Sequence, residues 1–389
     1  MDRGVMSAAT AQAAFDVIIL GGGMAGAALA GNLSPATSVA LVEREPLLGY
    51  HTTGRSAAMF IPSYGGAAIA GLTAASRAFF ADPPRGFGPP LLAPRPVMHI
   101  ADPSQVGRLD IFAAVQSVDR RDGMFEILDG RAARTRVPVL RPGAVAAALI
   151  ESDTGDLDVA RLHAAFVRQM TQAGGVVLAN AGACAITFDR KGWRVRGPNF
   201  DLSAPILVNA TGAWADETAI AAGLGPLGLT PLRRTVMLAR APAHGDFATW
   251  PVVKDIDERF YFRPCGERLL ITPADETPSA PCDAVADEMD IALGMARFES
   301  IVDHPVRNLI GRWAGLRTFA SDRSPVVGWS QSRAGFFWLA GLGGFGIQTA
   351  PAMGRLAAAL VEGRPVPSDL LDHGVQIRAY APARFGPAA

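Results

Sequence analysis

A glycine-rich turn between a strand and a helix, close to the amino terminus, most constrains the fold of this chain. The apolar segment Phe15–Leu20 is typical of a buried strand, and the small residues Ala25–Leu33 predict a helix. Between them the sequence has the spacing GxGxxG, through Gly21, Gly23 and Gly26. This order predicts the first half of a βαβ unit whose helix begins directly after a tight turn.

A second strand follows and ends at an acidic residue. The segment Ser38–Val42 is mostly apolar, and Glu43 comes 22 residues after Gly21. That spacing is typical of the acid that binds ribose hydroxyls in dinucleotide-binding units, where Gly23 would let the backbone approach the pyrophosphate. The helix N-terminus adds free N–H groups and a partial positive charge. We therefore expect a dinucleotide site, and the motif leaves FAD and NAD both open.

The composition excludes several other classes of protein. The 389 residues include 36 basic and 36 acidic side chains, and this zero net charge argues against a strongly basic nucleic-acid-binding protein. Only two of the basic residues are lysines, Lys191 and Lys254, and all the others are arginines. Hydrophobic residues make up 49% of the chain, which is typical of a globular enzyme with a large core.

The cysteine and histidine patterns predict no metal site. The three cysteines are scattered, and neither CxxC nor HxxH spacing occurs. So few cysteines suit a reducing compartment, and we expect a cytoplasmic protein. The long uncharged stretches are interrupted by glycine and proline, which argues against a membrane span. Residues 1–14 lack the apolar centre of a signal peptide.

Several longer motifs resemble the D-amino acid oxidase (DAO) superfamily of FAD-dependent oxidases and dehydrogenases, of the glycine oxidase and sarcosine oxidase type. One is Gly49–Ala58, which is similar to the second flavin-contacting segment of that family. The other motifs are most similar to bacterial D-arginine dehydrogenases: Gly71–Phe80, Pro90–Pro96, Arg233–Arg234, Phe260–Tyr261, Trp313–Arg317 and Gly343–Thr349.

This resemblance implies an α/β (α+β) fold, in which a Rossmann-like FAD-binding domain is interleaved with an antiparallel-sheet substrate domain. We assign the FAD-binding domain to residues 15–94, 137–225 and 311–378. We assign the substrate-binding domain to residues 95–136 and 226–310. We expect loose termini at residues 1–14 and 379–389.

The resemblance also implies non-covalent FAD. A second glycine-rich turn, residues 341–346, lies between the apolar strand Phe336–Ala340 and a helix at Ala350–Glu362. No cysteine lies near Gly343, where covalent members of the family attach their flavin. A third turn follows a strand at Ile206–Val208. The residues expected to bind the cofactor are Gly21, Gly23, Met24, Ala25, Gly26, Glu43, Arg44, Thr52, Thr53, Gly54, Arg55, Ser56, Ala57, Ala58, Ala183, Ala210, Thr211, Gly212, Trp214, Gly343, Gly344, Phe345, Gly346, Ile347 and Gln348.

The chemistry of this family requires a carboxylate anchor, because the flavin accepts a hydride from Cα and the protein positions that carbon. A guanidinium suits this task since it pairs with a carboxylate through two hydrogen bonds. By resemblance the anchors are Arg234 and Arg317, Tyr261 donates a hydroxyl, and Tyr64 lines or gates the pocket. A solvated strand position is the alternative for Arg234, and a plain loop position for Tyr64. The other expected pocket residues are Met59, Val97, Ile347, Gln348, Thr349 and Ala350.

Two positions depart from the D-arginine dehydrogenase pattern. Val97 replaces a glutamate that pairs with the substrate guanidinium, and Met59 replaces a histidine near the substrate. Both changes remove polar character, and a buried cation without a carboxylate partner is costly. We therefore predict a pocket that is positive at one end and apolar at the other. It would serve the oxidative deamination of an apolar D-amino acid rather than D-Arg, giving an imino acid, then a keto acid and ammonia.

Other substrates and acceptors stay open on the same scaffold. The alternatives are a secondary amine (an N-methyl or opine-like amino acid), a 2-hydroxy acid and, as a minor one, a non-catalytic flavin-binding protein. Oxygen-reactive sarcosine oxidases carry a lysine near the flavin, whereas the corresponding strand here, Arg268–Pro273, has none. We therefore expect electrons to pass to a quinone or another acceptor rather than to O2, and a quinone would imply peripheral membrane association.

Overall fold

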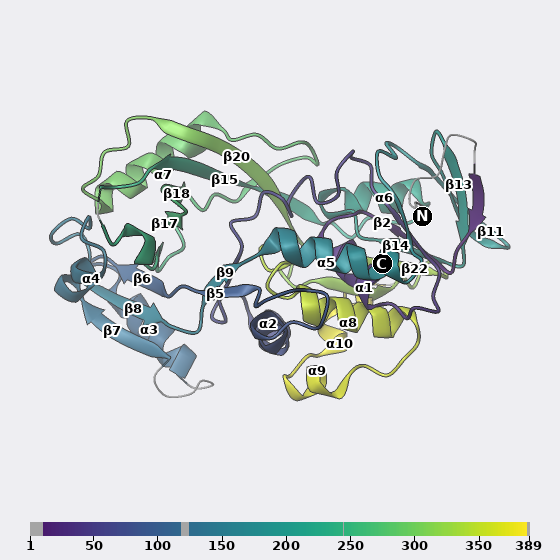
Figure 1. Ribbon diagram of the computed structural model, residues 1–389, viewed down its shortest axis with the longest axis horizontal. Helices are drawn as coiled ribbons and strands as arrows, with labels where there is room; N and C mark the ends of the chain where they lie inside the picture. Colours follow the sequence, from purple (N-terminus) through teal and green to yellow (C-terminus); the bar gives the residue numbers. More distant parts are fainter. Residues whose placement is uncertain (1–10, 118–123, 244, 387–389) are drawn as a thin grey trace.

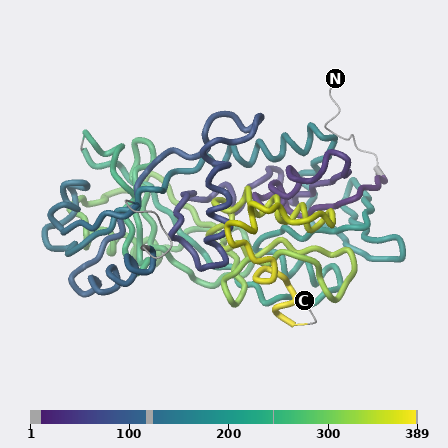
Figure 2. The backbone as a smooth tube through the Cα atoms, turned by 90° about the horizontal axis from the view of Figure 1, so that it is seen from below, coloured from purple at the N-terminus to yellow at the C-terminus, as the bar shows by residue number. Residues whose placement is uncertain are grey.

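The computed structural model of the protein describes residues 11–117, 124–243 and 245–386. Two parts lie at opposite ends of its long axis, one around a six-stranded sheet and the other around a nine-stranded sheet (Figure 1). The chain passes between the two parts several times, so that each is built from segments far apart in the sequence (Figure 2).

The six-stranded sheet is parallel except at one edge. Its strands lie in the order β10, β3, β2, β14, β22 and β21, and only β21 runs antiparallel to its neighbour. The central strands are apolar and buried along their whole length, because both faces of a parallel sheet are covered. The bounds are β2 Val17–Leu20, β3 Val39–Val42, β10 Val176–Leu178, β14 Ile206–Asn209, β21 Val326–Trp329 and β22 Phe336–Ala340.

Alternate residues of β2 pack into two separate cores. Ile19 packs with Leu356 on the helical face, whereas Ile18 packs with Trp193 on the other face. The helices around this part of the molecule are α1 (Met24–Asn32), α2 (Ala67–Ala81), α5 (Val159–Gln172), α6 (Ala215–Ala221), α8 (Ala350–Val361) and α9 (Ser368–Asp372). The opposite face is covered by a four-stranded sheet of β1 (Ala11–Ala14), β13 (Phe200–Ala204), β12 (Gly192–Arg196) and β11 (Ala185–Asp189).

The nine-stranded sheet forms the second part. Its order is β19, β15, β18, β17, β16, β6, β8 and β7, with β20 paired to β15. The pairs are antiparallel except β16 with β6, so the expected all-antiparallel sheet is corrected to a mixed one. The strands are β6 Val97–Ala101, β7 Phe125–Asp129, β8 Ala147–Glu151, β15 Thr230–Arg240, β16 Val252–Asp255, β17 Tyr261–Cys265, β18 Arg268–Thr272, β19 Thr277–Pro278 and β20 Leu309–Phe319.

Shorter elements complete the fold. Helices α3 (Val106–Ser117), α4 (Gly130–Arg136) and α7 (Glu288–Ile301) belong to the second part (Figure 1). A three-stranded sheet of β4 (Met59–Phe60), β9 (Gly155–Leu157) and β5 (Leu92–Pro94) lies between the two parts. Single turns of 3-10 helix occur at η1 (Gly212–Trp214) and η2 (Phe247–Thr249).

The sheet pairing shifts two of the expected domain boundaries. Strand β8 lies between β6 and β7, so residues 147–151 belong with the second sheet rather than with the FAD-binding segment 137–225. Strand β20 pairs with β15 over most of its length, which moves residues 311–319 to the second sheet as well. Hydrogen bonding between strands decides both assignments, and neither strand carries a sequence signal for its partner.

The described parts of both termini are ordered, which corrects the expectation of loose ends. Strand β1 pairs in parallel with β13. Near the other end, helix α10 (Ile377–Tyr380) and η3 (Pro382–Phe385) pack on the body of the protein. Tyr380 is buried and its hydroxyl donates to the Ala68 carbonyl at 2.7 Å, while Arg384 pairs with Asp322 at 2.7 Å. Residues 1–10 and 387–389 lie outside the described residues.

Candidate functional site

The larger of two adjoining cavities, about 430 Å³ in volume, lies at the carboxyl edge of the six-stranded sheet. Parallel strands end side by side at such an edge, so the residues that follow them meet there. Gly21 follows β2, Glu43 follows β3, Ala210 follows β14 and Gly341 follows β22. All four line this cavity, at the edge where the GxGxxG motif predicts a dinucleotide.

The first glycine turn leaves no space for side chains. Gly21 has a φ of +105°, and a Cβ there would lie 2.3 Å from the Ala210 carbonyl oxygen. A Cβ on Gly26 would lie 2.0 Å from the Gly21 carbonyl oxygen, so Gly26 sets how closely helix α1 approaches the turn. Gly23 lines the cavity, and a Cβ there would only touch Thr53 Oγ1 at 3.4 Å. The motif therefore combines two packing glycines with one glycine that faces the cavity.

The carboxylate of Glu43 is fixed beside this turn. Glu43 is buried, and its two oxygens accept backbone N–H groups from Gly22 at 2.8 Å and Glu45 at 2.9 Å. Each oxygen keeps a further lone pair for a ligand hydroxyl. Next to it, the Arg44 guanidinium lies over the Trp214 ring, 5.0 Å from the centroid. Both residues line the larger cavity.

The second glycine turn, residues 341–346, separates the larger cavity from the smaller one. Gly343 has a φ of +52°, and its N–H donates to the Thr318 carbonyl at 2.9 Å. A Cβ on Gly344 would lie 2.9 Å from Arg317 Nη1 and 3.0 Å from Tyr64 Oη. Glycine at residue 344 is thus what allows these two polar side chains to reach the backbone.

The structure places most, but not all, of the predicted cofactor residues on the larger cavity. Gly26, Gly54 and Phe345 do not line it, because Gly26 packs against the first turn and Phe345 lies in a small apolar cluster. Ala58 and Gln348 line the smaller cavity instead. The predicted residues that do line it are Gly21, Gly23, Met24, Ala25, Glu43, Arg44, Thr52, Thr53, Arg55, Ser56, Ala57, Ala183, Ala210, Thr211, Gly212, Trp214, Gly343, Gly344, Gly346 and Ile347.

Two residues on the wall of the larger cavity, Arg55 and Thr318, differ from what the sequence predicted. Arg55 was expected to bind the cofactor, yet its guanidinium donates to the Ala284 and Ala314 carbonyls at 2.8 and 3.0 Å and pairs with Asp283. The Thr318 hydroxyl, which the sequence did not single out, is buried and has no hydrogen-bond partner among the described residues. A buried hydroxyl without a partner is costly, and this one lies on the cavity wall.

The smaller cavity, about 70 Å³, adjoins the larger one and shares two arginines with it. Strands β15 and β20 pair antiparallel, with Arg234 opposite Gly315 and Arg317 opposite Leu232. Arg234 and Arg317 are therefore diagonal neighbours on the same face of the sheet. Gly315 has no side chain, and Arg55 packs over this position, where a Cβ would lie 3.5 Å from the Arg55 Cβ. Strand register, rather than sequence proximity, brings the two guanidinium groups together.

The two arginines differ in their partners. Arg234 is buried, and it donates to the Asp275 carbonyl at 2.8 Å and pairs with Glu276 at 3.2 Å. Burial and the like charge of Arg317 lower the pKa of Arg234. Arg317 donates to the Tyr64 hydroxyl at 3.1 Å, and no carboxylate of the described residues forms an ion pair with it. Arg317 is thus a cation that lines both cavities and lacks an anionic partner in the described chain.

Two polar residues of the smaller cavity were missed by sequence reasoning. Lys254 lies opposite Tyr261 on the neighbouring strand, and its ammonium lies 4.7 Å from the centroid of the Tyr64 ring. Glu258 pairs with Lys254 at 2.6 Å. Partial burial opposes its ionisation, but the charge and hydrogen bond of Lys254 outweigh this and lower the pKa of Glu258. The scarcity of lysine in this arginine-rich chain was the one signal that could have drawn attention to Lys254.

The smaller cavity has apolar residues such as Met59 and Ile347 on its wall, and the Lys254–Glu258 pair adds charge that the predicted apolar end did not include. Val97, Thr349 and Ala350 do not line the smaller cavity: Val97 is fully buried behind its wall, and the other two pack into the core. Val97 pairs with Val252 and leaves the same face of the sheet as Lys254, but packing against Ile61 and Val252 covers it. Of the predicted pocket residues, the smaller cavity is lined by Met59, Tyr64, Arg234, Tyr261, Arg317, Ile347 and Gln348.

Comparison with known families places this fold and site in a defined class. Residues 16–360 match the model of the family described as DAO, FAD dependent oxidoreductase. The chain therefore belongs to the DAO family of FAD-dependent oxidoreductases. The fold expected from the sequence is confirmed: it is the glycine-oxidase-like α/β fold with a FAD-binding and a substrate part.

The individual relatives carry several activities. A glycine oxidase of Geobacillus kaustophilus (strain HTA426) is 27% identical over 237 residues, which is 60% of this chain and 60% of that protein. The crystal structure of glycine oxidase from Geobacillus kaustophilus superposes with a TM-score of 0.79 at 23% identity, covering 94% of this chain and 99% of the other. The crystal structure of iminodiacetate oxidase from Chelativorans sp. BNC1 superposes with a TM-score of 0.78 at 20% identity, covering 94% of this chain and 98% of the other. At these identities the structures establish the fold, and they do not single out D-arginine dehydrogenase, the subgroup expected from the sequence.

Proposed function

We propose that this protein oxidises the Cα–N bond of a small amino acid, primary or N-substituted, and holds that substrate by its carboxylate. The observation that carries the proposal is Arg317, a guanidinium on the wall of both cavities whose one hydrogen-bond partner among the described residues is the Tyr64 hydroxyl. A partly buried cation is costly unless an anion pairs with it, and a substrate carboxylate supplies that anion. The neighbouring Arg234 would add a second charge-assisted hydrogen bond.

The residues of the larger cavity fit FAD. Gly21 and Gly23 present bare backbone at the start of α1, which suits a pyrophosphate, and Glu43 keeps lone pairs for ribose hydroxyls. The Thr318 hydroxyl, which has no hydrogen-bond partner among the described residues, gives the wall of the larger cavity a polar group for the ring system. Bound FAD would supply the hydride acceptor, the substrate leaving as an imino acid that water hydrolyses to a keto acid and either ammonia, from a primary amino acid, or an amine, from an N-substituted one. No cysteine lines the region of Gly343, which supports non-covalent binding.

The chain's own residues would orient the substrate. Arg317 and Arg234 fix the carboxylate, and Tyr261 lies beside them on β17, with its side chain on the cavity wall. Tyr64 holds the Arg317 guanidinium by its hydroxyl and closes the cavity against the 341–346 turn, where its ring packs on Phe345 at 4.8 Å. A volume of about 70 Å³, against the ~10–15 Å³ that one water requires, favours a substrate of few heavy atoms.

The finer assignments rest on separate arguments. The resemblance to D-amino acid enzymes favours the D configuration, with an apolar D-amino acid as the candidate that the sequence put first. The segment Arg268–Pro273 contains no lysine, which favours a quinone over O2 as the electron acceptor. Lys254 lies on the wall of the smaller cavity, however, and this makes O2 a stronger candidate. Among the described residues no helix is long and apolar enough to cross a membrane.

The experiment that tests the proposal is flavin reduction. The purified protein is mixed anaerobically with D- and L-forms of small amino acids, with glycine and sarcosine, and with 2-hydroxy acids, and the flavin absorbance is followed. We expect bleaching by small amino acids and the release of a keto acid with ammonia or, from an N-substituted substrate, an amine. Bleaching by 2-hydroxy acids alone, or the absence of any flavin, would overturn the proposal. Peroxide measured in air identifies O2 as the acceptor.

A further inference from the structure

Lys254 presents a third cation to the smaller cavity, in addition to Arg234 and Arg317. It lies on β16, opposite His99 on one side and Tyr261 on the other, so its side chain leaves the same face of the sheet as that of Tyr261. The side chain is 12% exposed, and it lines the cavity. Because β16 pairs with β6 on one side and β17 on the other, the backbone of Lys254 is fixed beside this wall.

The partner of Lys254 is held much less firmly. The Glu258 side chain is 52% exposed, and it reaches Lys254 from the turn between β16 and β17. Glu258 is the half-exposed member of this pair, and solvent competes there for its carboxylate, which weakens the ion pair. Rotation of one side chain releases Glu258 to solvent and leaves the Lys254 ammonium for another anion.

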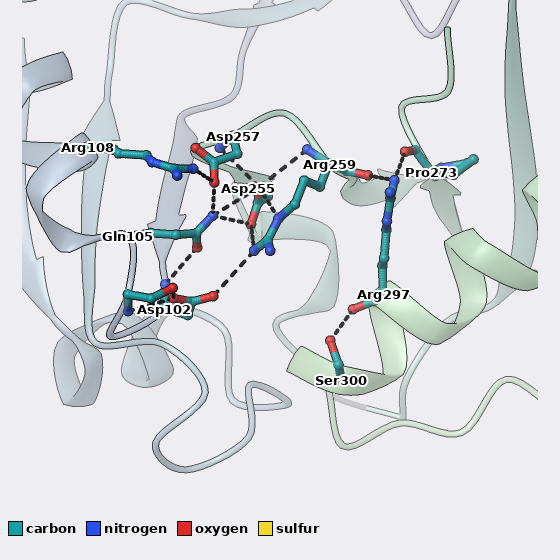
Figure 3. Close-up of polar contacts among 10 residues, drawn as sticks. Asp102, Gln105, Arg108, Asp255, Asp257, Arg259, Pro273, Arg297 and Ser300 are labelled. Carbon is teal, nitrogen blue, oxygen red and sulfur yellow. Dashed lines mark hydrogen bonds and ion pairs between the residues drawn. The ribbon is translucent and has the colours of Figure 1, made fainter. Parts of the chain in front are cut away.

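The turn that carries Glu258 is itself rigid, so the exchange needs no backbone movement. Buried Asp255 accepts from Arg259 Nη2 at 2.7 Å and from the Asp257 N–H at 3.0 Å (Figure 3). Arg297 fixes the far side of the turn by donating to the Arg259 and Pro273 carbonyls at 2.6 and 2.8 Å. Within this framework Glu258 adopts a φ of +58°, which directs its side chain to the cavity.

Two of the three cations on the wall of the smaller cavity, Arg317 and Lys254, contact the same tyrosine. Arg317 contacts the hydroxyl of Tyr64, and Lys254 lies over the face of its ring. The three cations on this wall differ in their carboxylate partners. Arg234 forms an ion pair with Glu276, and Lys254 forms one with Glu258, whose side chain can rotate into solvent. Arg317 forms no ion pair with a carboxylate of the described residues. A small molecule with two carboxylates, one for Arg317 and one for Lys254 across the Tyr64 side chain, matches this arrangement.

We propose that the cavity selects amino or imino acids with a second carboxylate, which Lys254 binds in exchange for Glu258 while Arg317 binds the first. This inference rests on the proposed function, in which Arg317 anchors a substrate carboxylate. It concerns the far end of the substrate, and it replaces the apolar side chain expected from the sequence by an anionic one.

The test compares ligands that differ only at the distal group. Succinate is paired with butyrate, and neither can be oxidised at a Cα–N bond, so binding is measured on the holoenzyme by calorimetry and by the shift of the flavin spectrum. Aspartate is paired with 2-aminobutyrate, and iminodiacetate with N-ethylglycine, for anaerobic flavin reduction. The variants are Lys254→Met, Lys254→Gln, Glu258→Gln and, as a matched control, Lys191→Met at the only other lysine, which lies in the exposed β11–β12 turn.

We expect wild-type holoenzyme to bind succinate at least tenfold more tightly than butyrate, and both Lys254 variants to remove that ratio. Glu258→Gln should increase the ratio several-fold because it removes the competing carboxylate, and Lys191→Met should leave it unchanged. An unchanged ratio in both Lys254 variants, or a preference for D-Lys that Glu258→Gln abolishes, would overturn the inference. Failure of the proposed function has a different signature, since no amino acid of either kind would then bleach the flavin.

Discussion

The larger and the smaller cavity lie side by side, yet they are built by different means. The larger cavity lies at strand ends, and much of its wall comes from the glycine-containing segments 20–25, 49–57 and 339–347. The smaller cavity is lined from five strands (β4, β15, β16, β17 and β20) and from several loops, with Tyr64 and Arg317 separated by 253 residues. The first therefore depends on spacing within a segment, and the second on register between segments.

This difference predicts how each cavity responds to mutation. The larger cavity should fail when an added atom displaces the chain, and it then loses fold and cofactor together. The smaller cavity should fail when one charge or hydrogen bond is removed, and the protein still folds. The following experiments separate these two kinds of failure.

The largest effect is expected at Arg317 in the smaller cavity. Arg317→Met removes the cation that would pair with the substrate carboxylate, at a cost of roughly 2–5 kcal/mol, or about 30- to several-thousand-fold in kcat/KM. We expect the flavin to stay bound, because the first glycine turn, which is proposed to hold its pyrophosphate, is unchanged in this variant. Arg312→Met is the control, since Arg312 lies on the same strand with its side chain 50% exposed. An equal loss of kcat/KM in Arg317→Met and Arg312→Met would show that the effect comes from disturbing strand β20 and not from removing the charge of Arg317.

A comparison of two glycines tests the larger cavity. In Gly26→Ala the new Cβ meets the Gly21 carbonyl oxygen, and we expect a loss of stability on the order of 3 kcal/mol together with loss of flavin. In Gly23→Ala the Cβ makes only an ordinary contact with Thr53, so the fold should persist while flavin affinity falls. Thermal unfolding and the flavin content of the purified variants measure both effects. Similar melting temperatures for the two variants would contradict this account of the turn.

A smaller effect is expected when one hydrogen bond of the smaller cavity is removed. Tyr64→Phe leaves the Arg317 guanidinium without its hydroxyl partner but keeps the ring that packs on Phe345. A hydrogen bond to a charged group contributes about 1.5 kcal/mol, so kcat/KM should fall roughly tenfold. Anaerobic stopped-flow reduction measures the change, and a variant as fast as wild type would remove Tyr64 from the set of positioning residues.

The smallest effect concerns two buried histidines, one behind each cavity. His99 bonds to Glu151 at 3.2 Å behind the smaller cavity, and His163 to the Gly22 carbonyl at 2.9 Å behind the larger one. Burial lowers the pKa of both. As the pH falls, these histidines are therefore protonated in the unfolded chain before they are protonated in the folded one. The free energy of unfolding should decrease below about pH 6.5, the ordinary pKa of histidine. The decrease is at most ~1.4 kcal/mol per pH unit for each histidine.

Urea unfolding at pH 7.5 and 5.5 measures this loss. His99→Gln and His163→Gln should each flatten the pH dependence, whereas His373→Gln, at an exposed site, should not. If neither buried variant changes the slope, acid destabilisation arises elsewhere in the molecule.

The contrast between the cavities also explains what could be predicted. The strand, turn and helix at Phe15–Leu33 and the acid at Glu43 form one local unit, so sequence spacing placed them correctly beside the larger cavity. Gly54 and Phe345 were assigned to the cofactor because they lie within matching motifs, but packing turns them away. Motif membership thus predicts the segment and not the direction of each side chain.

The amino-acid sequence by itself determined the parallel glycine-turn unit and the family, because both depend on local spacing, and it named Arg234 and Arg317 as candidate anchors without placing them side by side. Only the tertiary structure decided that β8 and β20 join the second sheet, that Val97 lies behind the wall and that Lys254 lies on it. Those outcomes depend on which strands pair, in which register and with what packed over them. A register change of one residue reverses every side chain, and nothing within a single strand records that choice.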